Sequence, residues 1–489
     1  MTPDELPARA AALIADGHRV ALVAGHDDRP SGGGLRAVYL FTRGATADAP
    51  ESRIELHVPL DPRDPRVPSL AALSFPAGRF ERRMRDLFGI VPVDHPLPRR
   101  LVRHFHWPRG WYPMLSDAGD PPAFGDTEGP YPFGAVTGPG VYEIPVGPVH
   151  AGMIGPGHFR FSVVGETILK LKARLWYTHR GIEKLFEGRT PEDGVVLAER
   201  ISGDTSVGHA LAFCLAVEDA RAGTVDPGVH RRRAVLLELE RLHNHVTDIG
   251  ALCNDVAHGV LDAHAQRVRE RLLRINDEVT GSRLLRGAFG PGSATLLRPP
   301  DPGVLGSLAV DVAGIVALAL GHSVVRDRFT GTAVLTAEQA TDLGTLGYVA
   351  RASGLPTDAR HDHPVLPPPP RTVHAHTGGD VLARFRVRAE EFAASVAYLT
   401  TLLGDPPPDL VVGRTPSGTG TGVGIVEGWR GTIVHRVELR PDGTLGRVAV
   451  VDPSFLNWPA LPVALADTIV PDFPLANKSF GLSYPGNDL

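Results

Sequence analysis

Two short polar segments of this chain carry residue pairs at the spacing that metal-binding motifs use. Ser202 and Thr205 are three positions apart, and so are Ser454 and Asn457. Paired thiolates at this spacing hold soft metal ions, but neutral hydroxyl and amide groups cannot replace a thiolate in that role. Both segments therefore look like metal motifs without their sulfur. We expect the four side chains to converge in space and to satisfy one another by hydrogen bonds.

A second kind of chemistry is possible at two pairs of histidines. His361 and His363 flank Asp362, and His374 and His376 follow a run of four prolines. Imidazoles beside a carboxylate can hold Zn²⁺ and activate a water molecule for hydrolysis. The pairs are spaced i, i+2 in a proline-rich loop, however, and no helix with a glutamate accompanies them. A zinc hydrolase is therefore the weaker interpretation.

Composition narrows the class of protein. A chain of 489 residues is long enough for two or more domains with buried cores. The formal net charge of -5 gives no indication of a nucleic-acid surface. The two cysteines, Cys214 and Cys253, lie far apart in apolar segments and are interpreted as buried, reduced thiols. The amino terminus has no signal-peptide pattern.

The most apolar stretch of the chain covers residues 304–325. Asp311 and several glycines interrupt it, which leaves an uncharged core shorter than the ~20 residues of a membrane-spanning helix. We interpret this stretch as a buried helix of a bundle. Membrane association is then expected to come through partner subunits.

The elements that position these residues divide the chain into an α+β amino-terminal unit and a larger helical unit. Residues 1–110 predict a small α+β domain, with helices over 8–15 and 80–90 (ending at Gly89) and strands over 20–23, 37–41 and 54–58. Residues 111–146, rich in proline and glycine, predict a linker that crosses the next domain.

Residues 147–489 predict a mainly helical bundle with a β-hairpin and a carboxy-terminal β element, so that the whole chain is α+β. The hairpin covers 159–175, where apolar and polar residues alternate. Helical spacing follows over 207–277, 306–325 and 382–403. Strands return over 424–451, with a turn at Pro441-Asp442-Gly443.

Several separated motifs carry a resemblance to known families. The segment 81–90 is similar to the small peripheral-arm subunit of respiratory complex I. Other segments resemble the large subunits of [NiFe] hydrogenases and complex I, namely 147–152, 156–161, 179–184, 199–200, 380–384, 426–431 and 477–480. A small domain fused ahead of a large one is the arrangement of the hydrogenase-4 and formate-hydrogenlyase large subunits. The chain is thus identified as a member of that family that lacks the four motif cysteines.

The resemblance implies that the metal centre is absent. In the family the motifs Arg-x-Cys-Gly-x-Cys and Asp-Pro-Cys-x-x-Cys hold nickel and iron, and here Ser202, Thr205, Ser454 and Asn457 take the cysteine positions. The family glutamate that relays protons to the metal falls at Gly155. An active formate-hydrogenlyase-type hydrogenase is therefore an alternative that loses both its ligands and its relay.

The complex I side of the resemblance implies a quinone pocket where the metals would lie. Quinone reduction needs hydrogen-bond donors for carbonyl oxygens that become negative. The resemblance assigns the histidine donor to His158, with His150 as the second choice, and its partner to Asp255. The family tyrosine falls at Gly203, so that donor is lost. We expect Asp255 to lie within hydrogen-bond reach of His158 or His150, directly or through one water, at the mouth of a cavity lined by the Ser202 and Ser454 segments.

The resemblance also implies partners. His179, Arg180, Glu183 and Lys184 are assigned to the interface with an iron–sulfur small subunit, whose cluster would supply electrons. Membrane antiporter-like subunits would anchor the assembly, with this chain peripheral on the cytoplasmic face. The chain itself would bind no cofactor apart from a possible quinone. A non-catalytic structural subunit is the alternative.

One further cluster is expected beside the pocket. Arg351, Asp358 and Arg360 lie within ten positions and predict an ion-pair network lining the same cavity.

Overall fold

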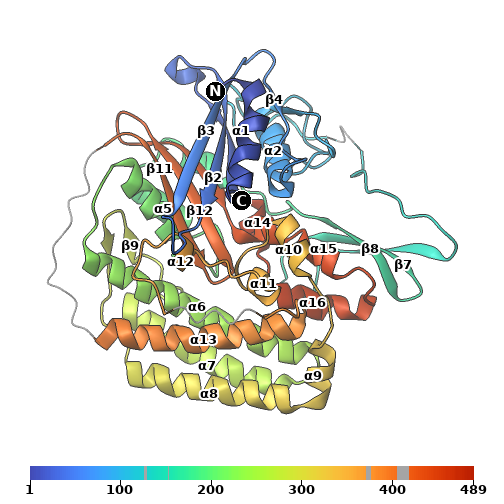
Figure 1. Cartoon of the computed structure of the whole chain (residues 1–489), viewed down its shortest axis with the longest axis vertical. Coiled ribbons are helices and arrows are strands. Elements are labelled where there is room, and N and C mark those ends of the chain that lie inside the picture. The colour runs from blue at the N-terminus through green and yellow to red at the C-terminus, as the bar shows by residue number, and fades with distance from the viewer. Residues whose placement is uncertain (126–128, 152–153, 371–375, 405–417) are drawn as a thin grey trace.

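The computed structural model describes residues 1–125, 129–151, 154–370, 376–404 and 418–489. Figure 1 shows a small sheet with two helices above a larger helical part, as the predicted α+β class requires. The hydrophobic core has two large parts: one runs from the amino-terminal sheet to the carboxy-terminal segment, and the other lies within the helical layer.

The amino-terminal unit is an antiparallel sheet covered by helices. Strands β1 (Arg19–Asp27), β2 (Leu35–Arg43) and β3 (Ser52–Leu60) pair in that order, and Tyr39 of β2 lies opposite Val23 and Leu56. Helix α1 (Leu6–Ala15) precedes the sheet, and α2 (Phe75–Phe88) packs on β1. As predicted, α2 ends at Gly89, whose φ of 74° places it in the left-handed region. The short strands β4 (Arg66–Pro68) and β5 (Val91–Val93) pair in parallel.

A three-stranded sheet extends from the body of the molecule (Figure 1). The predicted hairpin is present as β7 (His158–Val164) and β8 (Thr167–Arg174), and β6 (Val141–Val146) adds a strand to it. Sequence patterning missed β6 because Pro145 interrupts its short apolar run, and prolines within a run argue against a strand. Phe159 and Phe161 anchor the sheet, since each ring centroid lies 5.0 Å from that of Phe473.

Four long helices form the layer at the bottom of Figure 1. They are α6 (Pro227–Asp255), α7 (Gly259–Thr280), α8 (Pro302–Gly321) and α13 (Val381–Gly404), and they pack against one another. The predicted bundle is thus present. Shorter helices precede or connect these: α3 (Ile182–Phe186), α4 (Pro191–Ala198), α9 (Ser323–Phe329), α10 (Ala337–Leu343), α11 (Gly347–Ala352) and α12 (Ala359–Asp362). The strands β9 (Phe289–Gly290) and β10 (Ser293–Ala294) form a minimal hairpin.

The carboxy-terminal sheet consists of β11 (Thr421–Gly428), β12 (Gly431–Leu439) and β13 (Leu445–Val451), with the predicted turn between the last two. Helix α5 (Ser206–Ala220) lies directly on β11 because Gly422 and Gly424 have no side chain; a Cβ at either would collide with the α5 backbone. The chain then closes through α14 (Pro453–Asn457), α15 (Ala460–Ala464), α16 (Phe473–Phe480) and α17 (Tyr484–Asp488).

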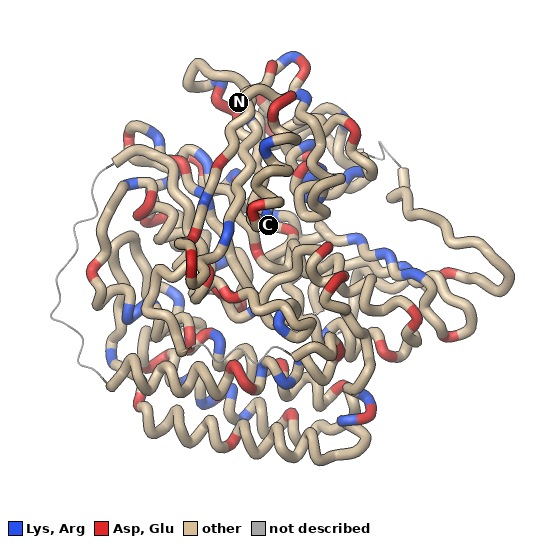
Figure 2. Tube along the Cα trace, in the orientation of Figure 1, with Lys and Arg blue, Asp and Glu red and all other residues tan. Residues whose placement is uncertain are grey.

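The prediction that residues 304–325 form a buried helix is wrong. Helix α8 has 20 residues and is the one helix among those described that is long and apolar enough to cross a membrane by length and composition. Only 28% of its apolar window is buried within the chain. In Figure 2 its tube is mostly tan, and Asp311 is the one charged residue within its range. The sequence could not show this, because glycine and alanine mark a helix that packs closely but not whether its own chain supplies the neighbour.

Candidate functional site

Ser202 and Ser454 come together through a third serine. Ser202, between α4 and α5, has its Oγ 2.8 Å from Oγ of Ser483. The Ser483 backbone N–H donates to Ser454 Oγ at 3.0 Å. All three side chains are buried. The segments around residues 202 and 454 therefore meet, although about 250 positions separate them, and the carboxy-terminal segment lies between them.

An ion pair closes this serine cluster on one side. Arg430 contacts Asp204 at 2.6 Å and donates to Thr205 Oγ1 at 3.1 Å. Burial opposes ionisation of Asp204, but Arg430 outweighs it and holds the pKa of that carboxyl well below its usual range. Thr205 also donates to Asp204, so its hydroxyl is fully used inside the protein.

Asn457 does not join the serine cluster. Its side-chain oxygen accepts from the Leu346 N–H at 2.8 Å and its amide donates to the Leu346 carbonyl at 3.1 Å. The residue that meets Ser202 directly is Ser483, and Gly486 follows it at the same three-residue spacing. A Cβ at Gly486 would collide with the Asp452 carboxylate. Sequence reasoning missed the segment of Ser483 and Gly486 because it shares only the three-residue spacing of the motif and lacks the Asp-Pro pair that precedes Ser454.

These residues do not fit a nickel–iron centre. The side chains at Ser202, Thr205, Ser454 and Ser483 are neutral hydroxyls, and each takes part in a hydrogen bond with another protein group. Soft metals of this kind need thiolate ligands, and the two free cysteines, Cys214 and Cys253, are buried in helices α5 and α6. Burial raises the pKa of each thiol to about 12, which disfavours the thiolate.

The predicted proton-relay position is filled by an aromatic ring. A Cβ built on Gly155 would lie 2.7 Å from the ring of Tyr484. Burial raises the pKa of the Tyr484 phenol to about 12, so the phenol is neutral at physiological pH. The space toward which a glutamate at position 155 would project is therefore occupied by this side chain.

A buried chain of titratable groups lies behind the serine cluster and was not predicted. His209 Nε2 lies 3.0 Å from Asp452 Oδ2, and His209 Nδ1 lies 3.0 Å from His435 Nε2. Asp452 also accepts the Ser454 N–H at 2.7 Å, which ties the chain to α14. Burial holds the pKa of His435 well below its usual value, so the neutral ring is favoured there. The three side chains form a continuous hydrogen-bonded chain from Asp452 through His209 to His435.

The expected pairing of Asp255 with a histidine is wrong. Asp255, at the end of α6, forms an ion pair with Lys478 of α16. His150 and His158 instead contact backbone carbonyls of their own loop, Gly157 O at 2.7 Å and Gly147 O at 3.2 Å respectively. An ammonium group is a stronger partner for a carboxylate than a neutral imidazole, and the four-lysine composition of the chain gave no hint that one would lie here.

The predicted interface segment is partly internal. Glu183 is buried and pairs with Arg83 of α2 and, at 2.8 Å, with Arg447 of β13. It also accepts the Val450 N–H at 2.8 Å. The assignment of Glu183 to the interface with the iron–sulfur subunit is therefore wrong, because Glu183 joins the amino-terminal unit to the carboxy-terminal sheet.

The other members of that segment are more exposed. Arg180 donates to the backbone carbonyls of Arg200 and Ile201 at 2.9 and 2.7 Å, and the residue is exposed. His179 Nδ1 lies 2.8 Å from the Asp488 carbonyl. Lys184 pairs with Glu187 at 2.9 Å. Arg180 and Lys184 thus remain available to a partner.

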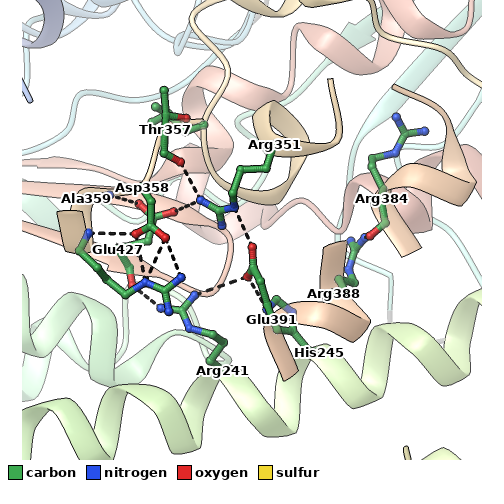
Figure 3. Close-up of polar contacts among 12 residues, drawn as sticks. Arg241, His245, Arg351, Thr357, Asp358, Ala359, Arg384, Arg388, Glu391 and Glu427 are labelled. Atoms are coloured by element: carbon green, nitrogen blue, oxygen red, sulfur yellow. Dashed lines mark hydrogen bonds and ion pairs between the residues drawn. The ribbon is translucent and has the colours of Figure 1, made fainter. Parts of the chain in front are cut away.

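The predicted network of Arg351, Asp358 and Arg360 is present and larger than expected (Figure 3). Arg351 pairs with Glu391 at 2.7 Å and Glu427 at 2.8 Å. Arg360 pairs with Asp358 at 2.6 Å and with Glu238 of α6 at 3.3 Å. The network therefore joins α6, α12, α13 and β11.

Burial and charge oppose each other within this network. Burial opposes ionisation of Glu391, but Arg351, His245 and Arg241 outweigh it and hold the pKa of that carboxyl well below its usual range. Burial raises the pKa of Glu427 despite Arg351. The pKa values of Glu391 and Glu427 are thus shifted in opposite directions although both carboxyl groups pair with Arg351. Titratable pairs of this kind are typical of functional sites, because binding one proton changes the net charge of the cluster.

Two cavities of about 30 Å³ flank Arg360, each large enough for a water molecule. One is lined by Glu238 and Glu427, the other by Arg351 and Glu391. Residues of the ion-pair network line these two cavities, and residues of the Ser202 and Ser454 segments do not. The two cavities are therefore not the expected pocket that the network shares with those segments.

A second buried arginine of α13 lies near the carboxy-terminal segment. Arg388 donates to the Ser479 carbonyl at 2.6 Å and to Asp248 at 2.9 Å. Its guanidinium lies 3.8 Å from the centre of the Tyr348 ring. Arg430 donates to the Gly481 carbonyl, two residues before Ser483. Both arginines therefore hold the backbone of residues 479–481.

The zinc alternative is not supported by these contacts. His363 contacts Glu51, and His376 lies 2.9 Å from Glu390, so the two histidines have separate partners. His374 lies outside the described residues. The metal-like group found among the described residues is His26, Asp28 and Glu438, and Arg36 already pairs with both carboxylates.

Three family descriptions match this chain. Residues 1–120 match the respiratory-chain NADH dehydrogenase 30 Kd subunit, and residues 248–417 match the 49 Kd subunit of the same enzyme. Residues 180–253, which include Ser202 and Thr205, match the nickel-dependent hydrogenases.

The most similar relatives that were found include subunits of hydrogenases and of NADH-quinone oxidoreductases. Formate hydrogenlyase subunit 5 of Escherichia coli is 30% identical, over 96% of this chain and 84% of its own length. Hydrogenase-4 component G of the same organism is 32% identical, over 83% and 73%. The C/D subunit of the NADH-quinone oxidoreductase of Bacteroides thetaiotaomicron is 29% identical, over 76% and 74%.

A solved structure has the same fold. A chain of the membrane-bound sulfane sulfur reductase, an archaeal respiratory membrane complex, superposes with a TM-score of 0.67 at 23% identity, over 71% of this chain and 98% of that chain.

Proposed function

The chain belongs to the family of large subunits of membrane-bound, complex I-like and hydrogenase-4-like oxidoreductases, and on that premise we propose that it works without a metal of its own. It holds an iron–sulfur partner subunit against its buried site and helps to pass electrons to a quinone-type acceptor. It lies at the cytoplasmic face of the membrane and is held there by antiporter-like subunits.

The observation that carries this proposal is the closed serine cluster. Ser202, Ser454 and Ser483 satisfy one another where the family motifs would meet, and Arg430 neutralises Asp204 beside them. The backbone segments that carry the family motifs still meet, but their side chains are neutral hydroxyls, which are poor ligands for nickel. A chain that keeps this frame without the metal ligands resembles the complex I branch of the family, in which the electron acceptor is a quinone.

The chain's own residues supply protons and electrostatics in this reaction. Reduction of a quinone to a quinol consumes two electrons, which would come from the partner's iron–sulfur cluster, and two protons. The hydrogen-bonded chain of Asp452, His209 and His435 next to α14 is the route that we assign to one of these protons. The carboxyl groups of Glu427 and Glu391 could then respond to the charge change through Arg351 and influence the membrane partners.

Metal analysis tests the metal-free part of the proposal. Native complex, purified with its neighbouring subunits, is analysed for nickel per copy of this chain, with Escherichia coli formate hydrogenlyase purified in parallel as the positive control. We expect far less than one nickel per large subunit. A value close to one would overturn the proposal, since a full complement of nickel requires ligands outside this donor set.

A purely structural subunit is the second candidate, and the pairing of Asp255 with Lys478 favours it. In that case His150 and His158 only bind the backbone of their own loop, and His209 transfers no proton. His209→Asn distinguishes the two: quinone reduction by the assembled complex falls if His209 handles protons, and is unchanged if the chain is only a scaffold. Copurification of the partner subunits serves as the control for assembly.

A further inference from the structure

A cleft of about 600 Å³ lies between the amino-terminal unit and the large unit. The amino-terminal unit supplies the start of β1 and residues 71–76, which lead into α2, and the large unit supplies the end of α10 and Leu456 of α14. Figure 1 shows α1 and α2 above α10 and α14, so the cleft lies where the two units meet. Cavities of about 300 to 1,000 Å³ at domain interfaces are typical sites for small ligands.

Most of the cleft wall is apolar. Hydrophobic side chains from both units line it, including Ile14, Val20, Ala72, Leu73, Phe75 and Leu456. Leu73 is 43% exposed and Phe75 is 44% exposed, so solvent reaches part of this wall. Because covering such a wall removes apolar surface from water, the cleft favours a ligand with a hydrocarbon body.

Arg19, at the start of β1, is the polar group that distinguishes this cleft. It lines the cleft, and its guanidinium forms no hydrogen bond or ion pair with another of the described residues. The other three arginines of the β1–β2–β3 sheet each pair with a carboxylate: Arg36, Arg43 and Arg53. Burial lowers the pKa of the Arg19 guanidinium, and Asp362 and Glu427 oppose this only by longer-range attraction. Since charges withdrawn from water are normally paired, an anion in the cleft would supply the missing partner.

Two other titratable side chains line the cleft and limit the charge of its ligand. The His18 ring is already engaged, because its Nε2 lies 2.9 Å from Ser52 Oγ and its Nδ1 lies 3.3 Å from Asp16. Asp342, on α10, is exposed and adds a negative charge to the lining. With one unpaired guanidinium and one carboxylate, the cleft suits a ligand with a single negative charge better than a polyphosphate.

We propose that the cleft between the two units binds a monocarboxylate with a hydrocarbon body. The carboxylate pairs with Arg19, and the hydrocarbon body packs against the apolar wall on both sides of the unit boundary. The ligand therefore joins the amino-terminal unit to the large unit and takes no part in electron transfer. This site goes beyond the proposed function and does not depend on it.

Isothermal titration of the purified full chain with decanoate tests this site. We expect saturable binding of one decanoate per chain. Decanol, which has the same body without the charge, should bind about tenfold more weakly, the size expected for the loss of a charge-assisted hydrogen bond. Arg19→Met should weaken decanoate binding by about the same factor. Arg66→Met is the control matched in charge, because Arg66 is exposed, pairs with Asp64 and lies outside the cleft lining.

A second variant tests the cleft without touching its charge. Ala72 is exposed and lines the cleft, so Ala72→Trp should fill the space and abolish decanoate binding while circular dichroism stays unchanged. Arg19→Met should melt no lower than wild type without ligand, because Arg19 has no hydrogen bond to lose. The proposal is overturned by any of three results: no saturable binding at millimolar decanoate, equal binding of decanol and decanoate, or wild-type decanoate affinity in Arg19→Met or Ala72→Trp.

Discussion

Replacing Glu183 with glutamine should destabilise the fold by about 3 kcal/mol at neutral pH. Glu183 is the buried anion between Arg83 and Arg447, and glutamine keeps its shape and its bond to the Val450 N–H while removing its charge. Burial raises the pKa of this carboxyl, but Arg447 and Arg83 outweigh it and lower the pKa from 4.5 to about 2. A shift of that size corresponds to about 3 kcal/mol of stability, an order-of-magnitude value.

The pH dependence of the effect has a definite sign. A carboxyl whose pKa is lowered by folding contributes stability above its unfolded value of 4.5, and this contribution is lost as pH falls toward about 2. The difference between wild type and Glu183→Gln should therefore be full at pH 7 and shrink steadily below pH 4.5.

Urea unfolding of both proteins between pH 7 and pH 3 measures this difference. Glu187→Gln is the matched control, because Glu187 pairs with the half-exposed Lys184 one turn later and should cost less than about 1 kcal/mol. A Glu183→Gln difference below about 1 kcal/mol, or one that does not change with pH, would refute the reasoning and return Glu183 to the role of a partner contact.

Three further predictions follow from buried contacts around the serine cluster. Gly155→Glu should destabilise the chain by several kcal/mol in urea unfolding, because its Cβ would lie 2.7 Å from the Tyr484 ring; full stability would show that the ring moves aside easily. Glu240 has its pKa raised from 4.5 to about 8 by burial, so stability should fall as pH rises from 4.5 to 8, and Glu240→Gln should remove that slope; a parallel pH profile in the variant would contradict this. Cysteine at Ser202, Thr205, Ser454 and Asn457 together should yield no hydrogen evolution, because Asn457 turns toward Leu346 and Gly155 has no relay; measurable hydrogen would refute the assignment.

The two helices and the three long strands of the amino-terminal unit could be predicted from sequence because each carries a local signal, whereas the three-residue strands β4 and β5 are too short to show one. Apolar runs bounded by glycine, aspartate and proline mark β1, β2 and β3, and Gly89 ends α2 through its positive φ. The exposed strand β6 and the exposure of α8 lack such a signal. Both depend on what lies beside the segment, and a pattern along one chain does not record that.

The candidate site was predictable only in part, for the same reason. The motif around Ser202 lies next to a helix start and keeps its position, whereas its partner is Ser483 and not Asn457. Glu183 and Asp255 were assigned to a partner interface and to a histidine pair, but their partners, Arg83 and Lys478, come from segments 100 and 223 positions away. Long-range ion pairs of this kind follow from the packing of the elements, which local sequence patterns do not encode.

Quinone reduction without nickel tests the central claim most directly. The native complex is purified from cells grown in nickel-depleted medium and in nickel-replete medium, and the reoxidation of its reduced iron–sulfur partner by a soluble quinone is followed spectroscopically. We expect equal, quinone-dependent rates from both preparations. Reoxidation that requires nickel, or a partner cluster that quinone does not reoxidise in either preparation, would contradict the proposed metal-free electron transfer.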